Sequence, residues 1–286
     1  MKGECEIGIV SWWKHHADSQ VIEVMLSSAR ARTVFAIVSL FSACAMSMEE
    51  PCAFGLNGKI DVSTDSACVS KGRTIHDAPV TCMRGFLSDF RIVDTTIPAF
   101  VGCIGKLSIS DTDRYPEETP GEWVEIDPTA GLEWSRYVGL EDDMRLVARW
   151  FRWTFPATCR APSDAAILDA TVKTLLNPTA SLWYRFHGPT KGRFEVLLSA
   201  SEECGIWDEL KAFGTLNAWF VDSRNECGDR ESGANAGELV GGLSWRCFYV
   251  KSAYWFQLDR RVLSGDNPTY DYDKQVIFSV GMKLAF

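Results

Sequence analysis

The chain ends on the stretch Gln275-Val276-Ile277-Phe278-Ser279-Val280-Gly281-Met282-Lys283-Leu284-Ala285-Phe286. Large apolar side chains occupy every second position from Val276 to Phe286, and the positions between them are polar or small, with Ile277 as the exception. Successive side chains of a β-strand point to opposite faces. The stretch therefore predicts a strand with one apolar and one polar face that ends on an aromatic residue.

The same period of two recurs from about residue 58 onward. Within 192–201, Phe194 and Leu198 share one expected face, whereas Arg193 and Glu195 share the other. Several of these runs reach about ten residues, longer than the five or six that are usual in soluble β-sandwiches. The pattern predicts long antiparallel strands whose polar faces carry full charges. Further alternating runs lie at 123–135, 168–174, 178–187 and 209–220, and the strand at 80–96 is placed by its neighbours.

Long polar connectors alternate with short ones along the chain. Outer-membrane barrels have this asymmetry, with short periplasmic turns and longer extracellular loops. Six loops and five turns join twelve strands, which predicts an all-β, transmembrane, antiparallel up-and-down barrel with both chain ends of the barrel on the periplasmic side. The loops are expected at 71–79, 111–121, 155–165, 187–191, 222–236 and 259–273, and the turns near 91–97, 136–141, 175–178, 202–208 and 247–250.

Composition excludes some classes of protein and leaves others open. Of the 286 residues, 46% are hydrophobic and 23% are charged, and no run of about 18 apolar residues is present, so a helical membrane bundle is excluded. A β-barrel fits, because a barrel strand presents only every second residue to lipid. A soluble globular protein fits equally well. The net charge of −9 with scattered Lys and Arg argues against nucleic acid as a partner.

The sequence contains no recognisable catalytic or cofactor motif. It has no G-x-S-x-G elbow, no H-E-x-x-H pair and no phosphate-binding loop. We therefore expect no enzyme activity, no cofactor and no metal site. The four histidines are dispersed along the chain, at His15, His16, His76 and His187.

The N-terminal region has the order of features found in a secretory signal peptide. A basic segment with Arg30 and Arg32 precedes the apolar run 33–46, and Ala43-Cys44-Ala45 supplies a small-residue cleavage site. We expect 25–45 to be a cleaved signal peptide and 46–286 to be the mature barrel, with 1–24 an over-extended gene start. A partial lipobox ending at Cys44 and a buried core helix are the alternatives that this region leaves open.

Cysteines predict one cross-link near the start of the barrel. If a hairpin is centred between Gly72 and Ala78, Cys68 and Cys82 lie directly opposite each other. Opposed residues of an antiparallel pair have Cα atoms about 4.5–5.5 Å apart, which falls within the disulfide range. Exported proteins meet an oxidising environment. The spacing therefore predicts a possible Cys68–Cys82 disulfide, with two free thiols as the alternative.

Three parts of the sequence carry a family resemblance. They are the terminal QVIFSVGMKLAF, the first hairpin (69–73 and 77–80), and the turn 175–178 followed by a Trp- and Tyr-rich strand. Over residues 56–286 the chain resembles the porins of Gram-negative bacteria that form barrels of about twelve strands. That resemblance implies that Phe286 is an assembly signal read by the barrel-assembly machinery. It also implies outer-membrane lipid and small solutes as partners.

Charged side chains on the polar faces are the candidate functional residues. In a barrel of about twelve strands they point into the lumen, where side chains fill much of the space and set selectivity. A purely structural ladder of ion pairs that plugs the barrel is the alternative. The candidates are Asp61, Asp65, Glu125, Asp127, Glu133, Arg145, Arg149, Asp169, Lys173, Arg185, Arg193, Glu195, Lys211, Arg246, Lys251 and Lys283.

Aromatic residues near the expected strand ends form a second group. Such residues mark the two membrane–water interfaces of outer-membrane barrels. Ordinary packing in a soluble core is the alternative. The group comprises Trp123, Trp134, Trp150, Tyr184, Phe220, Tyr254, Phe256 and Phe286.

Taken together, these features predict a passive, porin-like channel for small solutes in the bacterial outer membrane. A plugged structural or adhesion barrel, a barrel enzyme acting on lipid and a secreted soluble β-sandwich that binds a ligand are the competing interpretations. Both signs of charge occur on the polar faces, so the sequence assigns neither anion nor cation preference.

Overall fold

The structure is a computed structural model, and it describes residues 57–70, 73–92, 95–110, 119–157, 160–222, 232–259 and 276–286. All of them belong to one compact unit, Glu50–Phe286. The expected signal peptide at 25–45, with the segment before it, lies outside the described residues. Within the described ranges, no helix is long and apolar enough to cross a membrane.

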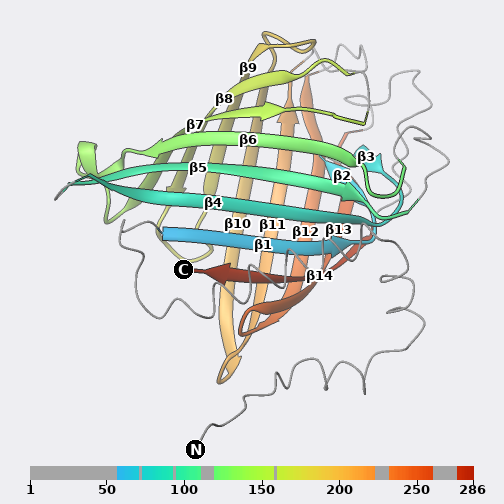
Figure 1. The fold of residues 1–286 in the computed structure, drawn as a ribbon. Coiled ribbons are helices and arrows are strands. Elements are labelled where there is room, and N and C mark those ends of the chain that lie inside the picture. Colours follow the sequence, from blue (N-terminus) through green and yellow to red (C-terminus); the bar gives the residue numbers. More distant parts are fainter. Residues whose placement is uncertain are drawn as a thin grey trace, which may run out of the picture. The chain divides into compact units, whose positions relative to one another are not determined.

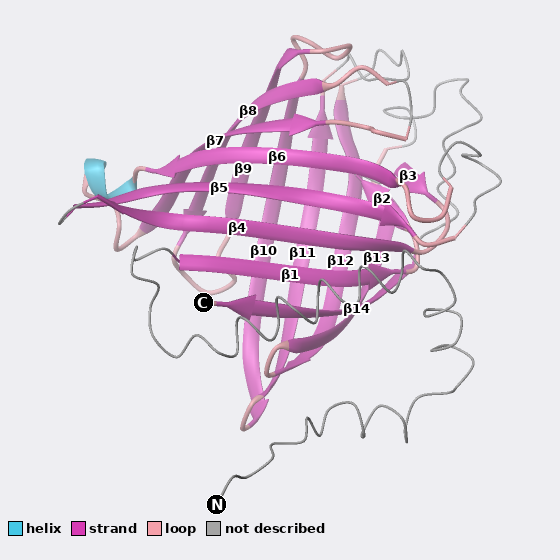
Figure 2. Ribbon diagram, viewed as in Figure 1, coloured by secondary structure: helices cyan, strands magenta, loops and turns pink. Residues whose placement is uncertain are grey.

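Twelve strands form one closed antiparallel barrel, as the alternation predicts (Figures 1 and 2). Each strand pairs with the next one along the chain, except that β1 pairs with β4 and closes the barrel against β14. The barrel strands are β1 (Asn57–Asp65), β4 (Val80–Ile92), β5 (Thr95–Ser108), β6 (Trp123–Glu133), β7 (Met144–Trp153), β8 (Ser163–Val172), β9 (Thr179–His187), β10 (Phe194–Trp207), β11 (Leu210–Val221), β12 (Gly233–Trp245), β13 (Phe248–Gln257) and β14 (Val276–Ala285).

The first and last strands of the barrel close it. They pair in register from Lys59 opposite Ala285 to Asp65 opposite Ser279. Beyond the end of β14, the Gly58 N–H donates to the Phe286 carbonyl (2.7 Å), and the Phe286 N–H donates to the Gly58 carbonyl (3.0 Å). The Phe286 ring occupies the space that a side chain at position 58 would take, so Gly58 permits this contact. Closure leaves no open sheet edge, as a membrane-spanning sheet requires.

The two faces of the barrel differ as the alternation predicts. Apolar side chains on the outer face are exposed, for example Leu198 (46%) and Val280 (56%). The exception in the terminal strand, Ile277, is 6% exposed and packs inside the barrel against Ala253 and Trp255. The interior therefore contains apolar packing as well as charges. Ile277 still faces inward, as its position in the alternation requires, and there it packs in an apolar cluster.

The two ends of the barrel are unequal. Short links join the strands at the end that also holds the start of β1 and the end of β14, and we call it the turn end. Long connectors lie at the opposite loop end, and the first of them carries a separate hairpin, β2 (Cys68–Ser70) and β3 (Arg73–His76). A single turn of 3-10 helix, η1 (Ser135–Val138), lies in the link between β6 and β7. The predicted rhythm of six loops and five turns matches this arrangement.

Two predicted turns were misplaced. Strand β10 continues to Trp207 and β13 begins at Phe248, so two-residue links, 208–209 and 246–247, replace the expected turns at 202–208 and 247–250. The polar run from Ser201 to Cys204 resembles a turn, but each of these residues pairs with a residue of β11. Asp208 and Arg246 have positive φ (43° and 54°), which tight hairpin links require. The loops before β8 and β12 also end earlier than expected, by three and four residues, because β8 begins at Ser163 and β12 at Gly233.

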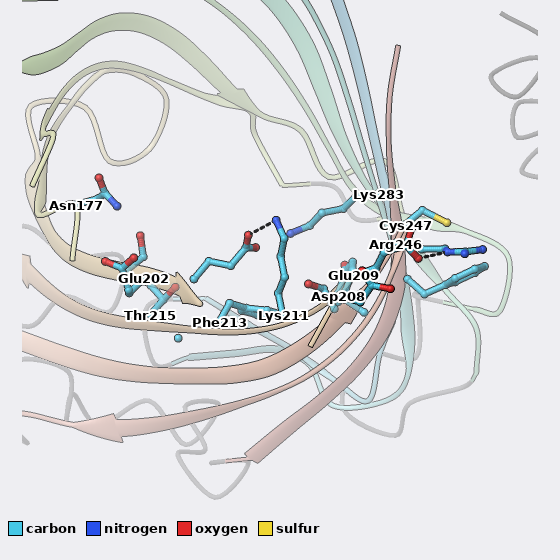
Figure 3. A pocket seen from close by; sticks show the side chains of 16 residues that line it. Asn177, Glu202, Asp208, Glu209, Lys211, Phe213, Thr215, Arg246, Cys247 and Lys283 are labelled. Atoms are coloured by element: carbon cyan, nitrogen blue, oxygen red, sulfur yellow. Dashed lines mark hydrogen bonds and ion pairs between the residues drawn. The ribbon is translucent and has the colours of Figure 1, made fainter. Parts of the chain in front are cut away.

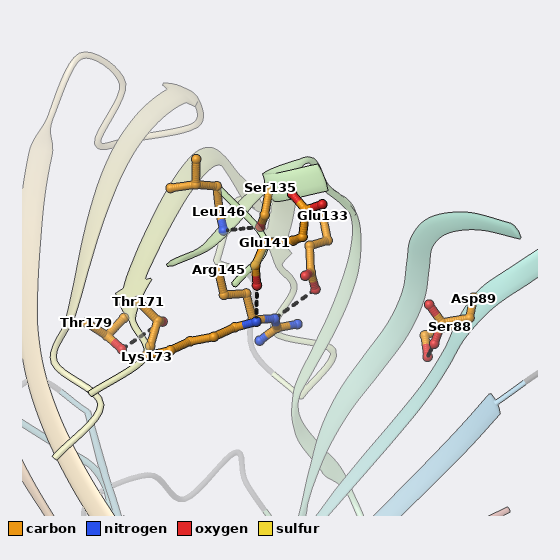
Figure 4. A network of polar contacts seen from close by, with 10 residues as sticks. All are labelled: Ser88, Asp89, Glu133, Ser135, Glu141, Arg145, Leu146, Thr171, Lys173 and Thr179. Carbon is orange, nitrogen blue, oxygen red and sulfur yellow. Dashed lines mark hydrogen bonds and ion pairs between the residues drawn. The ribbon is translucent and has the colours of Figure 1, made fainter. Parts of the chain in front are cut away.

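Polar contacts fasten the links at the turn end (Figure 4). The Leu146 N–H donates to Ser135 Oγ (2.7 Å), and Arg145 Nε donates to Glu133 Oε2 (2.8 Å). The Lys173 ammonium donates to the backbone carbonyl of Glu141 in the neighbouring link. These bonds satisfy polar groups where the strand ladder stops.

We predict that Leu198→Arg destabilises the barrel in lipid, because the side chain lies on the exposed apolar face near the middle of β10. The free energy of unfolding should fall by about 2–4 kcal/mol, the cost of Arg near the bilayer midplane. Urea titration in liposomes, followed by tryptophan fluorescence, measures it.

Ser201→Arg is the matched control on the inner face of the same strand, where Ser201 borders a cavity. It should change the free energy of unfolding by much less. Equal losses for both variants would contradict the assignment of the two faces.

Candidate functional site in the barrel lumen

The strand register places most of the predicted charged residues on the inner face. Directly opposed residues share a face, so the run Asp61, Arg84, Ile104 and Asp127 across β1, β4, β5 and β6 follows one inner row. The same reasoning applied around the barrel gives the set on the inner face of the strands. It comprises Asp61, Asp65, Glu125, Asp127, Glu133, Arg145, Arg149, Asp169, Arg185, Glu195, Lys211, Lys251 and Lys283, with Arg193 immediately before β10.

Two further predicted residues lie in links at the turn end, outside the inner face of the strands. Lys173 follows β8 and donates to the Glu141 carbonyl, and Arg246 sits in the two-residue link after β12, where it forms an ion pair with Glu209. Both are exposed at the turn end. In the sequence, both residues continue the spacing of the polar positions in the strand before them. The strands end at Val172 and Trp245, however, so neither residue belongs to the wall of the lumen.

Ion pairs connect neighbouring strands across the inner wall. Arg149 of β7 binds Asp169 of β8 through two contacts, 2.7 and 3.3 Å. Glu195, which is 1% exposed, accepts from Arg193 (2.7 Å) and Arg185 (3.3 Å). Buried charges are tolerated when they are paired and hydrogen-bonded, and removing one partner of such a pair is strongly destabilising. These charges therefore neutralise each other within the wall.

Another ion pair lies near the loop end. The Lys106 ammonium of β5 and the Glu125 carboxylate of β6 form it, and Asp127 lies two residues further along β6. Asp127 is 2% exposed, and its Oδ1 has no hydrogen-bond partner among the described residues. At its loop end, the part of the wall formed by β1, β4, β5 and β6 thus carries more carboxylates than cations, since Asp65 lies at the end of β1, which β4 separates from β5.

Tryptophan side chains fill another part of the interior. The rings of Phe151 and Trp153 lie 4.7 Å apart, and Trp183 lies 5.7 Å from Trp153 and 5.8 Å from Trp219. The Arg185 guanidinium lies over the Trp153 ring at 4.2 Å. Aromatic pairs and guanidinium stacking stabilise beyond simple area burial. The lumen therefore has an aromatic cluster among its ion pairs.

The sequence reasoning missed this cluster. Trp183 falls between Ser181 and Arg185 in the alternating run 178–187, on the polar face, and Trp219 follows Asn217 in the same way. Large apolar residues at polar-face positions are the signal that could have identified them. They indicate that the inner face is partly packed rather than uniformly solvated.

The β2–β3 hairpin lies across the loop end of the lumen. The segment that leads into it is held at β14, because the Ser66 N–H donates to the Phe278 carbonyl (2.8 Å). Ala67 is 4% exposed and packs with Trp255 and Ile277. At the other side, the fully buried His76 has Nε2 3.3 Å from Ser108 Oγ of β5. The hairpin therefore spans from the β14 wall to the β5 wall and narrows the interior.

The hairpin also overturns the predicted cysteine pairing. Cys82 is in register with Ser63 of β1, whereas Cys68 pairs with His76 inside the small hairpin. Both thiols are free and buried. The register was wrong because residues 66–79 do not continue the first barrel hairpin. They leave β1 at Asp65 and fold into a sheet of their own.

A cavity of about 740 Å³ opens at the turn end of the interior (Figure 3). It is bordered by β10, β11, β12, β13 and β14 and by the links between them, and Lys211 and Lys283 project into it. Lys211 is paired with Glu203 at 2.7 Å. The volume of the cavity is typical of small-molecule sites, which span about 300–1,000 Å³. Other side chains lining it are Ser201, Glu202, Phe213, Thr215, Ser244 and Tyr249.

Most of the predicted aromatic residues lie on the outer face, but Trp134 lies in the link after β6 with its indole N–H buried. Trp150, Tyr184, Phe220, Tyr254 and Phe286 are 36–42% exposed, and the rings of Tyr184 and Phe194 lie 4.7 Å apart. Near the loop end, Trp150 Nε1 donates to Asp164 (2.9 Å), which also contacts His187 (3.0 Å). Aromatic side chains next to polar ones such as Asp164 and His187 are the arrangement expected at a membrane–water interface.

No metal site is evident in the described part of the chain, where no group of three or more His, Cys, Asp or Glu side chains is suited to hold an ion. The inner carboxylates Glu125, Asp169 and Glu195 instead form ion pairs, with Lys106, Arg149 and Arg185 respectively.

No protein-family model matches the chain, and no curated protein is similar to it in sequence. Among solved structures, the chain is similar to Salmonella typhi OmpF in complex with daunomycin, with a TM-score of 0.33 and 8% sequence identity. The match covers 81% of this chain and 97% of that one. A similarity this low carries no argument, so the fold assignment rests on the strand pairing itself.

We predict that the Cys68 thiol reacts very slowly in the folded barrel. Burial raises its pKa to about 12, so at pH 8 only roughly one molecule in ten thousand carries the reactive thiolate. Maleimide labelling of a variant whose sole cysteine is Cys68 measures this.

The control places the sole cysteine at the exposed Ser66, two residues earlier. We expect it to label at least about a hundredfold faster, with both sites equal in urea, because only Cys68 is buried. Equal rates in the folded protein would show that Cys68 is not buried in the barrel interior.

Proposed function

We propose that this protein is an outer-membrane, porin-like channel that passes small polar solutes slowly and without a catalytic step. The observation that supports it is the combination of a closed barrel, an exposed apolar outer face and a charged inner face. Lipid accepts the first face, and water and polar solutes are accommodated by the second.

The unequal ends support an orientation. The short turns lie at the same end of the barrel as the start of β1 and the end of β14. Outer-membrane barrels keep such turns in the periplasm. We place the loop end, with the β2–β3 hairpin, at the cell exterior and the cavity of Figure 3 at the periplasmic side. The export signal expected at 25–45 fits that destination.

The proposal limits the solutes to small ones. A barrel of about this size has an interior that side chains largely fill. Here Trp153, Trp183 and Trp219 occupy part of it, and the hairpin crosses the loop end. We therefore place the narrowest part of the path beneath the hairpin.

A plugged barrel without transport is the second candidate. It is favoured by the same aromatic cluster and by ion pairs such as Arg149–Asp169, which neutralise each other and stabilise the interior on their own. Conductance measurements separate the two candidates.

We predict that replacing residues 67–77 by a short Gly-Ser linker raises single-channel conductance several-fold in planar bilayers. The linker removes Ala67 and Val69 from the Trp255 cluster and leaves the register of β1 and β4 intact. The wild-type barrel should show small conductance steps.

Trp255→Ala tests the same point without shortening the chain and should produce intermediate openings, because Trp255 packs against the hairpin. Trp245→Ala, on the exposed outer face of the neighbouring strand, is its matched control and should behave like wild type. If neither the wild type nor the linker variant conducts while both are folded, the plugged barrel is the correct interpretation.

We also propose that Phe286 is read by the barrel-assembly machinery. Deleting it should lower the amount of heat-modifiable, folded protein in outer membranes far more than it lowers folding into detergent micelles. We expect the intrinsic loss to be small, because Phe286 lies at the end of the seam, where it exchanges two backbone hydrogen bonds with Gly58. A deletion variant that reaches the membrane at the wild-type level would contradict this role.

A further inference from the structure

Three lysines on one part of the inner wall have no carboxylate partner. Lys59, Lys251 and Lys283 lie on the adjacent strands β1, β13 and β14. Within the described part of the chain, none of their ammonium groups forms an ion pair, whereas Arg149 and Lys211 elsewhere on the wall each do. This part of the wall therefore carries excess positive charge.

Two carboxylates lie near enough to interact with these lysines, and both are already engaged. Glu238 of β12, near Lys251, accepts from Asn217 Nδ2 (2.7 Å), and the other carboxylate is Asp61. Asp61, directly opposite Lys283 in the register, accepts from Arg84 (3.5 Å) and from the Tyr249 hydroxyl (2.8 Å). Tyr249 reaches it by lying over Gly281, where any side chain would collide with its ring. Asp61 thus has two donors, and its single charge is shared with Arg84.

Lys283 joins this charge to the cavity at the turn end. Its ammonium lies 4.9 Å from the centre of the Tyr249 ring and 5.8 Å from that of Phe213, and all three side chains line the cavity (Figure 3). Lys251 also faces the Tyr249 ring, at 5.9 Å. The cavity therefore presents a cation beside two aromatic surfaces.

Of the four carboxylates that border the cavity, two are paired with cations, Glu202 accepts one backbone N–H, and Asp208 lies at the rim. Glu203 binds Lys211, Glu209 binds Arg246, and Glu202 accepts the Leu176 N–H (2.9 Å). These contacts lie toward the exposed links of the turn end. The hydroxyls of Ser201, Thr215 and Ser244 add neutral hydrogen-bonding groups to the lining.

We propose that this cavity binds small organic anions, namely monocarboxylates with an apolar or aromatic body. Lys283 supplies the charge-assisted hydrogen bond to the carboxylate. Lys251 and Lys59 add attraction at longer range, as like charges lining a cleft do. Phe213 and Tyr249 provide the surfaces for the body. The role of this site as a channel vestibule rests on the proposed function, but binding does not require conduction.

Calorimetric titration of the detergent-solubilised barrel with benzoate and with benzylamine at low salt tests the proposal. Benzoate should bind and benzylamine should bind much more weakly, although Asp208 is available at the cavity rim. Lys283→Gln should weaken benzoate binding by about tenfold, the effect of losing one charge-assisted hydrogen bond. Lys283→Arg should retain most of the affinity.

Lys191→Gln is the matched control, since it removes the same charge from an exposed position in the loop-end link between β9 and β10. It should leave benzoate binding unchanged. Preferential binding of benzylamine, or benzoate binding that is insensitive to Lys283→Gln, would overturn the anion site.

Bilayer recordings with benzoate as the anion keep the two proposals apart. Benzoate binding in a barrel that never conducts would contradict the proposed channel and support the proposed anion site. Conduction without benzoate binding would remove the site and leave the channel. If both stand, the wild-type reversal potential should favour benzoate over sodium, and Lys283→Gln should shift it toward zero.

Discussion

The pairing of β1 with β14 is the constraint on which the rest of the structure depends. Seven register pairs, from Lys59–Ala285 to Asp65–Ser279, join the first and last strands and leave the sheet without an edge. A sheet in hydrocarbon must satisfy its backbone groups internally, and only closure achieves this. Closure also fixes which side chains face inward. Asp61, Lys283 and Arg84 share one inner row, so their charges are held close together. Each must be paired with an opposite charge, hydrogen-bonded or hydrated inside the barrel.

The interior meets that requirement by different means at different heights. Ion pairs such as Arg149–Asp169 neutralise charge between neighbouring strands, and Trp153, Trp183 and Trp219 fill space that charged side chains leave. At the loop end the β2–β3 hairpin adds Ala67 to the inner apolar packing. At the turn end the filling is incomplete, and a cavity with Lys283 in its wall remains. The proposed channel and the proposed anion site are both consequences of this uneven filling.

The alternation and the connector rhythm were enough to predict the barrel, its strand number and the charged inner face, because an exposed outer face and an enclosed inner face impose a period of two on the strands. Local sequence could not predict the hairpin, since residues 66–79 have the polarity of an ordinary loop. The contacts that bury Ala67 and hold Val69 are made with a cluster that includes Trp255 and Ile277, far away in the chain. The Cys68–Cys82 prediction was wrong for the same reason. The lysines were predicted as inner residues, but which of them lack partners depends on the register of β14 against β1 and β13.

Cross-linking across the seam tests the central claim most directly. In a cysteine-free background, Val62→Cys and Met282→Cys place two cysteines directly opposite each other on the outer faces of β1 and β14. Opposed Cα atoms are about 4.5–5.5 Å apart, within disulfide range. Closure predicts near-complete intramolecular cross-linking in membranes under a mild oxidant, whereas Val62→Cys with Leu216→Cys on β11 should not cross-link. Absence of the Val62–Met282 cross-link, or cross-links formed between molecules instead, would contradict the closed barrel.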